Sequence, residues 1–307
     1  MTTIRSFHNN DLPELLRVWI AHWSAITKAP QVNLPRLEQA IASRTFFDPH
    51  SLLVAESEGQ IVGWTHFLAS SDPSEVVMPM NCILPECGKE VAESLLTEAL
   101  VRARAGGFKV VKAGVVRDER FGYAGLEPIG HGIGVPTADE RFTELLKKFG
   151  FSELNSVTRM VAGILFYRPP VSREALQFRR SAKADSGNLI PDAQRRASGL
   201  SHIDIEHFRL LQRAGPTLAE VDFWFSDPEA EVLSPTTSIL DLGPIQARGE
   251  LSSAESYLIA STMQTLATRN IQTVETAIDS EKKTLIQQLE RICFETTDSG
   301  VVWELKL

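Results

Sequence analysis

The sequence has few cysteines and a deficit of positive charge. Cys82, Cys87 and Cys293 form an odd set without the spacing of a disulfide framework, which is consistent with reduced thiols. Thirty-one Lys and Arg residues stand against 39 Asp and Glu, giving a net charge of −8. A chain with this balance is not expected to bind nucleic acid or an anionic membrane through a general basic face. Any anionic ligand must therefore be held locally.

Long hydrophobic runs are also missing. The N-terminal segment MTTIRSFHNND has no apolar core of signal-peptide length, and no apolar run approaches the roughly 20 residues needed to span a bilayer. We therefore expect a cytoplasmic protein without membrane contact. The 307 residues, 43% of them hydrophobic and 23% charged, are typical of a soluble chain with room for two domains.

The most informative stretch runs from Met80 to Gly114. Its apolar run ends at Leu84-Pro85, and after Gly88 the apolar residues recur with helical spacing up to a Gly106-Gly107 stop. A short β-branched run follows, Phe108 to Val111, which predicts a buried strand. A strand that leads through a glycine turn into a helix directs free N–H groups and a positive dipole end at one place. The stretch therefore predicts a site for a pyrophosphate.

This turn resembles the pyrophosphate-binding motif of the GNAT acyltransferases, Gln/Arg-x-x-Gly-x-Gly/Ala. Cys87 stands where the family has Arg or Gln, Glu90 where it has Gly, and Ala92 fits the last motif position. The stretch from Asp139 to Phe151 looks like the family's penultimate helix, which ends in Gly-Phe. The resemblance implies an α/β fold (α+β by sheet type), with a mixed, mostly antiparallel sheet flanked by helices. It also implies that acetyl-CoA contacts Ile83, Leu84, Cys87, Gly88, Lys89, Glu90, Val91 and Ala92.

The rest of the first half fits this fold. We expect a hairpin that turns at Glu58-Gly59 and a single fourth strand from Val76 to Leu84. The other expected elements are a strand over Thr3 to Phe7, a helix after Asp11, helices over Leu34 to Ser43 and Asp139 to Phe149, and a closing strand over Val157 to Phe166.

The chain then repeats itself. An offset of 163 residues places Leu95-Leu96 on Leu258-Ile259 and Gly107 on Asn270, and from the last helix onward the offset is 143. We predict a domain over 1–168 and a second GNAT-like domain over 169–307, with a linker at Pro169-Pro170 and a polar first strand within 181–188. The second half should contain a hairpin at Gly215-Pro216, strands over Ser238 to Leu242, Ile271 to Ile278 and Val301 to Leu307, and helices over Leu251 to Ala267 and Lys282 to Ile292.

The change of offset leaves an insertion of about 20 residues in the first half, Arg117 to Pro136. It is rich in glycine and resembles the glycine-rich loop of tandem-domain GNAT proteins. Tyr123, Glu127 and His131 supply a phenol, a carboxylate and an imidazole, so this loop is a candidate active-site segment. The alternative interpretation is a loop that only supports the domain interface.

Catalysis must depart from the family pattern. The family's general acid is usually a Tyr on the last helix, and the two corresponding positions here are Leu146 and Leu289. The catalytic candidates are therefore Tyr123, Glu127 and His131, with Glu86 as a further possible base. Cys82, Cys87 and His131 do not have the spacing of a compact zinc ligand set, and no Gly-x-Ser-x-Gly nucleophile motif is present. We expect no metal.

The second half is the weaker candidate for binding CoA. The offset places Glu250, Ser253 and Glu255 at its motif positions, where two carboxylates would repel a phosphate. We predict an acetyl-CoA-dependent N-acyltransferase with its active site in the N-terminal domain, acting on a primary amine. The sequence leaves open which amine this is and what oligomeric state the protein has. The alternative is a non-catalytic CoA-binding or interaction protein on a decayed acyltransferase fold. We also expect truncation after Gly300 to unfold or aggregate the second domain.

Overall fold

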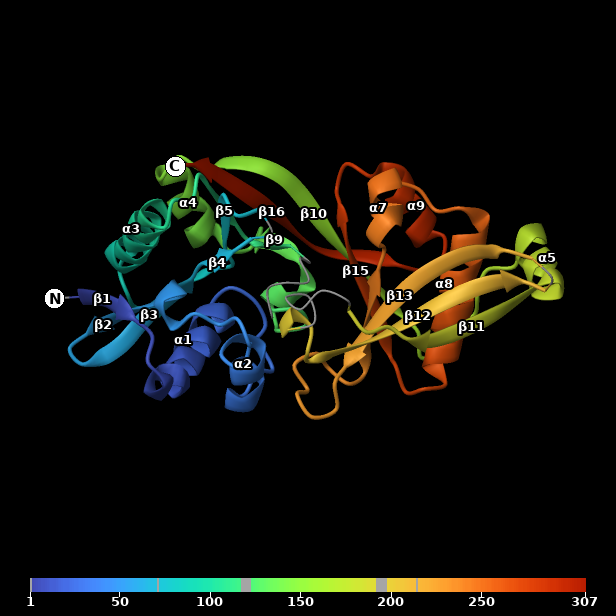
Figure 1. The fold of residues 1–307 in the computed structure, drawn as a ribbon, viewed down its shortest axis with the longest axis horizontal. Helices are drawn as coiled ribbons and strands as arrows, with labels where there is room; N and C mark the ends of the chain where they lie inside the picture. The colour runs from blue at the N-terminus through green and yellow to red at the C-terminus, as the bar shows by residue number, and fades with distance from the viewer. Residues whose placement is uncertain (1, 71, 117–122, 192–197, 214) are drawn as a thin grey trace. The chain divides into compact units, whose positions relative to one another are not determined.

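The computed structural model describes residues 2–70, 72–116, 123–191, 198–213 and 215–307 (Figure 1). The chain forms two compact α/β units. Unit 1 comprises Met1–Val157, Ser198–Leu200 and Ser299–Leu307, and unit 2 comprises Thr158–Ala197 and Ser201–Asp298. The α/β class expected from the sequence is confirmed in both units.

Unit 1 begins with the elements that the sequence predicts. They are β1 (Thr2–Ser6), α1 (Leu12–Ser24), α2 (Leu34–Ile41), β2 (Leu52–Ser57) and β3 (Gln60–His66). The β2–β3 hairpin turns at Glu58 and Gly59, which have φ values of 53° and 77°. Both are in the left-handed region that two-residue hairpin turns require. β1, β2 and β3 pair antiparallel in that order.

The prediction of one continuous fourth strand over Val76 to Leu84 is wrong. It consists of β5 (Glu75–Met78) and β6 (Asn81–Ile83). β5 pairs parallel with β7 (Val110–Ala113), whereas β6 pairs antiparallel with β3. The break falls at Pro79, which lacks the N–H that an unbroken ladder would use. In the described part of unit 1, the sheet therefore parts between β6 and β7, beside the start of the next helix.

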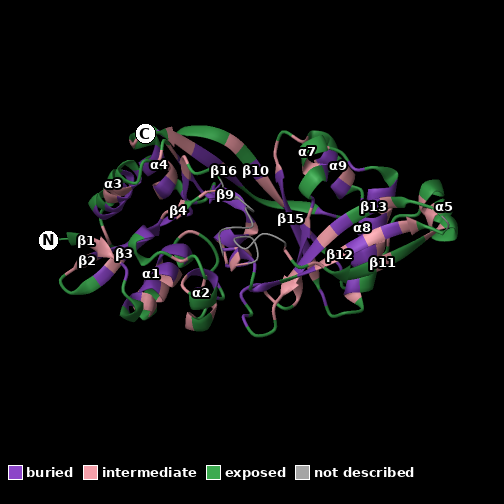
Figure 2. Cartoon of the chain, in the orientation of Figure 1, coloured by how far each residue is buried: buried purple, intermediate pink, exposed green. Residues whose placement is uncertain are grey.

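One face of unit 1 is covered by α3 (Lys89–Ala105) and α4 (Glu140–Lys148). Leu95 and Leu96 of α3 share a buried core cluster with Leu146 of α4 and with Trp303. Figure 2 shows the buried inner sides of these helices in purple. The two predicted helices are confirmed, and the structure shows Gly88 and Asp139 to be their N-cap residues.

The described part of the predicted insertion, residues 123–136, contains two short elements. After β8 (Val115–Val116), residues 117–122 lie outside the described residues, and η3 (Ile129–His131) and β9 (Ile133–Pro136) follow. β9 pairs with β8 and with β16 (Glu295–Lys306). Gly134 has a φ of +78°, and a Cβ built on it would lie 2.6 Å from the carbonyl oxygen of Val301. Glycine is thus required here for a close approach to the protein's own backbone.

Unit 2 carries the repeat. α8 (Ser253–Ala267) and β15 (Thr273–Asp279) correspond to α3 and β7 at the offset of 163, and α9 (Lys283–Glu290) corresponds to α4 at 143. The hairpin of β12 (Ile203–Gln212) and β13 (Thr217–Ser226) is confirmed, as are β11 (Ala182–Asn188) and β14 (Thr237–Asp241). Among the elements that the structure describes, α5 (Arg173–Ser181), which follows the expected linker, and α7 (Gly243–Arg248) were not predicted.

The last strand of each sequence half contributes to both units. β10 (Ser152–Gly163) places Met160 and Ala162 in the core of unit 2, and Ile164, directly after the strand, joins them there. Its counterpart β16 pairs with β7 and places Trp303 in the core of unit 1. The sequence interpretation assigned each closing strand to its own half. That assignment is corrected here, because the apolar residues at the ends of β10 and β16 fill the core of the other half's unit.

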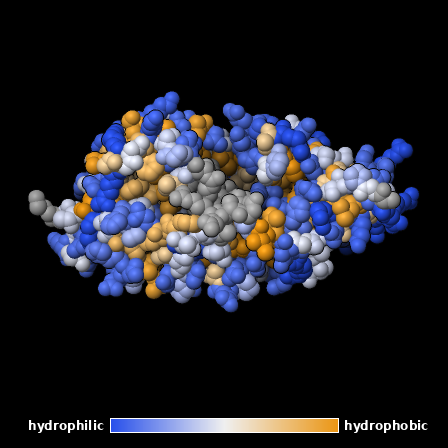
Figure 3. Space-filling model, viewed as in Figure 1, coloured by the Kyte–Doolittle hydropathy of each residue, from blue (hydrophilic) through white to orange (hydrophobic). Residues whose placement is uncertain are grey.

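No helix within the described ranges is long and apolar enough to cross a membrane. The face drawn in Figure 3 is mainly hydrophilic, with apolar side chains in scattered groups.

Candidate functional site

The predicted pyrophosphate turn leads into α3 as expected, but a carboxylate lies at the helix start. Gly88 is the N-cap residue, with extended backbone angles and no side-chain cap of its own. The carboxylate of Glu90 folds back so closely that it would collide with a Cβ on Gly88. Free N–H groups of the first turn attract anions to this position. Glu90 therefore competes with any phosphate for the start of α3.

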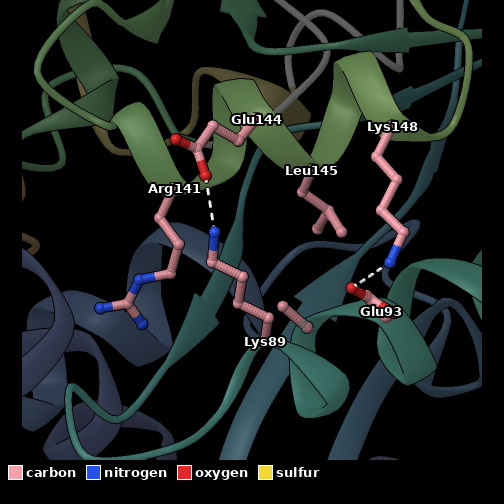
Figure 4. A pocket seen from close by; sticks show the side chains of 7 residues that line it. Lys89, Glu93, Arg141, Glu144, Leu145 and Lys148 are labelled. Carbon is pink, nitrogen blue, oxygen red and sulfur yellow. Dashed lines mark hydrogen bonds and ion pairs between the residues drawn. The ribbon is translucent and has the colours of Figure 1, made fainter.

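A pocket of about 250 Å³ lies between α3 and α4. Figure 4 shows the side chains that line it. They are Lys89, Ala92 and Glu93 from α3, and Arg141, Glu144, Leu145 and Lys148 from α4. Three of these side chains are cationic and two are anionic, so the lining has a net positive charge within a chain of net negative charge.

Two ion pairs cross this pocket. Lys89 Nζ lies 2.8 Å from Glu144 Oε2, and Lys148 Nζ lies 2.5 Å from Glu93 Oε1 (Figure 4). The bond to Lys89 lowers the pKa of Glu144 and the bond to Glu144 raises the pKa of Lys89. Lys89 and Glu144 are largely exposed, so water and salt screen their attraction. Both lysines can therefore exchange these partners for a more highly charged anion.

Arg141 is the cation on the pocket wall with unused hydrogen-bonding capacity. Its Nη1 atom is buried and has no hydrogen-bond partner among the residues that the structure describes. A buried, unpaired guanidinium nitrogen is costly, and a phosphate oxygen is the partner that its geometry suits. The sequence interpretation did not single out Arg141, because the family motif lies on the turn rather than on α4.

A second polar group lies at the parting of the sheet. Because the Leu84 N–H bonds to the Val62 carbonyl, the N–H and C=O of Ile83 point away from β3. His22 of α1 meets this edge, with Nδ1 3.1 Å from the Ile83 oxygen and 3.3 Å from the Ile83 nitrogen. Its Nε2 lies 3.6 Å from Oδ2 of Asp139, the N-cap of α4. The sequence indicated Asp139 as a helix boundary and gave no signal for His22, because only the fold brings α1 to this edge.

Tyr123 is buried and hydrogen-bonded. Its hydroxyl lies 2.9 Å from His66 Nδ1, and His66 Nε2 lies 3.1 Å from Ser51 Oγ. Ser51 Oγ donates to the Asp48 carbonyl, so it accepts from Nε2–H, and Nδ1 then accepts from the tyrosine. Burial raises the pKa of Tyr123 well above its usual value and lowers the pKa of His66 to about 3. The phenol proton is therefore directed at a neutral imidazole.

The other two loop candidates have different surroundings. Glu127 Oε2 accepts from the Gln31 N–H at 3.0 Å, and the Glu127 carbonyl accepts from the Trp19 indole at 3.0 Å. His131 ends η3 and is partly buried. Tyr123 and Glu127 thus share a loop but bond to separate elements, β3 for the former and the segment before α2 for the latter.

The two cysteines near the turn are protonated thiols. Burial raises the pKa of Cys82 well above its usual value, and burial together with Glu86 and Glu90 raises the pKa of Cys87. Neither has the lowered pKa of a nucleophilic cysteine. Within the described ranges, no group of three His, Cys, Asp or Glu side chains is placed to hold a metal ion.

The corresponding helix start in unit 2 is occupied. Glu255 Oε1 and Oε2 lie 2.6 and 2.8 Å from Arg248 Nη2, and the carboxylate also accepts from the Ser252 N–H at 2.8 Å. Ser252 caps the Glu255 N–H in return, which completes a capping box. This pairing satisfies the helix start from within the chain.

Comparisons with known proteins identify the fold. No family model and no curated protein matches the sequence. A tandem GNAT protein from the clavulanic acid biosynthesis pathway, solved without acetyl-CoA, has a TM-score of 0.69 at 13% identity, with coverage of 100% of this chain and 98% of that chain. A GCN5-related N-acetyltransferase from Sphaerobacter thermophilus has a TM-score of 0.64 at 11% identity, with 99% and 95% covered.

A glucosamine N-acetyltransferase region of a fungal multi-domain β-N-acetylglucosaminidase has a TM-score of 0.71 at 16% identity. It matches 99% of this chain, which spans 38% of that longer protein. The fold is therefore that of the GNAT acetyltransferases. Because the tandem GNAT protein matches end to end, the chain has two GNAT-like halves.

Proposed function

We propose that this protein is an acetyl-CoA-dependent N-acyltransferase that binds CoA in unit 1 and acts on a small primary amine. The observation that carries the proposal is the buried Nη1 of Arg141, which has no partner among the described residues and belongs to a cationic pocket beside the start of α3. The parting of β6 from β7 supports it, because it leaves the backbone of Ile83 free of strand pairing on that side, and Ile83 shares a buried cluster with Ala92 and Leu145 of the pocket wall.

The residues would divide the work as follows. Arg141, Lys89 and Lys148 would contact the phosphates, while Gly88 allows a close approach to the first turn of α3. Glu90 opposes this contact by like charge and would have to move aside. Ile83, Leu84, Val91 and Ala92 would contact the rest of the cofactor, as the family resemblance implies. Tyr123, Glu127 and His131 remain the acid–base groups proposed from the sequence.

The alternative is a non-catalytic CoA-binding or interaction protein on this fold. Two observations favour it: Glu90 lies at the phosphate position, and both family tyrosine positions are core leucines, Leu146 and Leu289, each 0% exposed. Only the first hypothesis predicts that the protein transfers acetyl groups from acetyl-CoA to an amine.

Calorimetric titration with CoA tests the binding site. The parent should bind, and Arg141→Gln should weaken binding about tenfold with a smaller dependence on salt, because one phosphate contact is lost. Arg104→Gln is the matched control, since Arg104 is an exposed arginine in the last turn of α3. Equal losses in the two variants would mean that the effect is general electrostatics. A parent that does not bind CoA contradicts the proposal.

Acetyl transfer to a panel of primary amines then tests catalysis. Tyr123→Phe should lower turnover ~10²–10⁴-fold if the phenol is the proton donor. If substitution of all three loop residues leaves turnover unchanged, the loop is only a structural support. If the parent binds CoA but shows no turnover, the non-catalytic alternative is favoured.

A further inference from the structure

The sheet of unit 2 has an open edge at β11. This strand, Ala182–Asn188, pairs antiparallel with β12 and with no other strand of the described residues (Figure 1). Its seven residues keep one register with β12, and the strand contains neither a bulge nor a proline. Proteins often protect an edge with a bulge, a proline or a very short strand, because an open edge attracts another strand. β11 has none of these three features.

The hydrogen bonds to β12 determine which backbone groups of β11 face outward. The Arg213 N–H donates to the Ser181 carbonyl, and the Leu189 N–H donates to the Ile205 carbonyl. Odd-numbered residues therefore form the hydrogen-bonded pairs with β12. The N–H and C=O groups of the even-numbered residues point away from β12, toward the open edge.

Three even-numbered residues supply these groups in the main part of β11. The Ala182 N–H already donates to the Phe178 carbonyl at the end of α5, so only the Ala182 carbonyl is available. Ala184 and Ser186 present both an N–H and a carbonyl to the edge. The edge therefore offers donors and acceptors to a further antiparallel strand.

Two charged side chains restrict which strand fits this edge. Lys183 and Asp185 are two residues apart, so they lie on the same face of the sheet. Lys183 is exposed and has no ion pair within the described part of the chain. Asp185 Oδ2 lies 2.6 Å from Arg209 Nη2, which leaves Oδ1 for a second cation. A complementary antiparallel strand carries an acidic residue opposite Lys183 and a basic residue opposite Asp185, and β11 itself has this pattern.

We propose that two copies of this chain form a dimer in which β11 pairs antiparallel with β11 of the other copy about a two-fold axis at Ala184. The Ala184 N–H of each copy donates to the Ala184 carbonyl of the other, and the Ser186 N–H donates to the Ala182 carbonyl. Lys183 of each copy lies opposite Asp185 of the other. The contact is independent of the proposed transfer reaction, because β11 belongs to unit 2 and the pocket to unit 1.

The charges select this register over its neighbours. Lys183 and Asp185 occupy non-hydrogen-bonded pairs, in which the side chains of opposite strands lie closest. A register centred on Lys183 or on Asp185 sets that residue opposite its own copy, which like charge disfavours. A register centred on Ser186 sets Lys183 opposite Leu189 and forms no ion pair.

Exposed groups beside β11 fit the same register. Ile190, two residues after the strand, is 84% exposed, and none of the nine residues of α5 is buried. Because Asn188 of one copy lies opposite Arg180 of the other, Ile190 is brought to the last turn of the other copy's α5. The dimer therefore covers apolar surface that a single chain leaves in water.

Sedimentation velocity of the full-length chain measures the dimer. We expect a Kd in the micromolar range, visible between ~1 and ~200 µM, because one strand pair and a short helix make a small interface. Lys183→Glu and Asp185→Lys, each alone, set like charges opposite one another and should weaken the dimer about tenfold. An equimolar mixture of the two variants restores opposite charges at both contacts and should dimerise as the parent does. Lys28→Glu, at an exposed lysine of unit 1, is the matched control.

A proline variant tests the backbone contact. Ala184→Pro removes an N–H that points to the open edge and leaves the hydrogen bonds to β12, which come from the neighbouring residues. This variant should stay monomeric at every concentration while its circular dichroism and urea midpoint match those of the parent.

The remaining outcomes contradict the proposal. A parent that is monomeric over the whole concentration range overturns it. A dimer that persists in Ala184→Pro and in both charge variants forms through another surface, which also overturns it. If Ala184→Pro does not fold, the charge variants decide: a mixture that dimerises no better than its two components excludes the pairing of Lys183 with Asp185.

Discussion

At the scale of single residues, Glu90 is the side chain that most directly opposes CoA binding. Its carboxylate lies against Gly88, at the positive end of α3. Glu90→Gln keeps the size of the side chain and removes the charge, so we expect the Kd for CoA to fall about fivefold at low salt. The gain should shrink as salt screens the site. Calorimetric titration measures it, with Glu98→Gln, in the middle of the same helix and away from its start, as the control. An unchanged Kd would mean that Glu90 turns away when the ligand binds.

His66 is a second single residue with a testable effect, because it makes the stability of the fold depend on pH. Burial lowers its pKa to about 3 in the folded state, whereas an unfolded histidine titrates near ~6.5. Between these pH values the unfolded chain binds a proton that the folded chain does not. The contribution of His66 to the free energy of unfolding is therefore fully present above pH ~6.5, and it decreases as the pH falls, by up to about 1.4 kcal/mol per pH unit.

Urea unfolding of the parent and of His66→Gln between pH 7 and pH 5 measures this contribution. The variant should lose less stability over this interval, because the other titrating groups are common to both proteins. Parallel curves would show that His66 takes up a proton without unfolding. The exposed histidine variant His50→Gln should follow the parent.

At the scale of elements, the end of β16 stabilises unit 1. Truncation after Gly300 removes Trp303, which is 2% exposed in the core of unit 1, and the strand that pairs with β7. Loss of the tryptophan alone should cost ~3–5 kcal/mol. We therefore expect unit 1 to unfold first, which reverses the expectation drawn from the sequence that the second domain would unfold.

Hydrogen exchange resolved by segment checks this prediction. Amides of β7 and α4 should lose protection in the truncated chain, while those of the β12–β13 hairpin should keep theirs. Removal of Leu307 alone is the milder control, since it deletes a single backbone bond to Lys109. Loss of protection confined to unit 2 would contradict the assignment of β16.

At the scale of the whole molecule, the two units should differ in ligand binding. The helix start in unit 2 is closed by Glu255 and Arg248, whereas the pocket in unit 1 carries an arginine nitrogen without a partner among the described residues. Calorimetry should therefore give about one CoA per chain, and Glu255→Gln should not create a second site because the capping box keeps the turn satisfied. Two equal sites would contradict the proposal.

Local sequence determined much of the fold. Apolar spacing and caps located α1, α3, α4 and α8, and a Glu-Gly turn located the first hairpin, because these signals act over a few neighbouring residues. The internal repeat was also readable, since β10 and β16 correspond residue for residue at the offset of 143. The turn that leads into α3 was located for the same reason.

The tertiary structure alone decided the contacts between distant segments. The sequence could not place Arg141 on the pocket wall or His22 at the edge of β6, because both depend on how helices pack across the parted sheet. It also assigned the end of β16 to the wrong unit. An apolar strand specifies that one of its faces is buried, but which core buries it depends on the free energy of the whole arrangement, and Trp303 finds its place in unit 1.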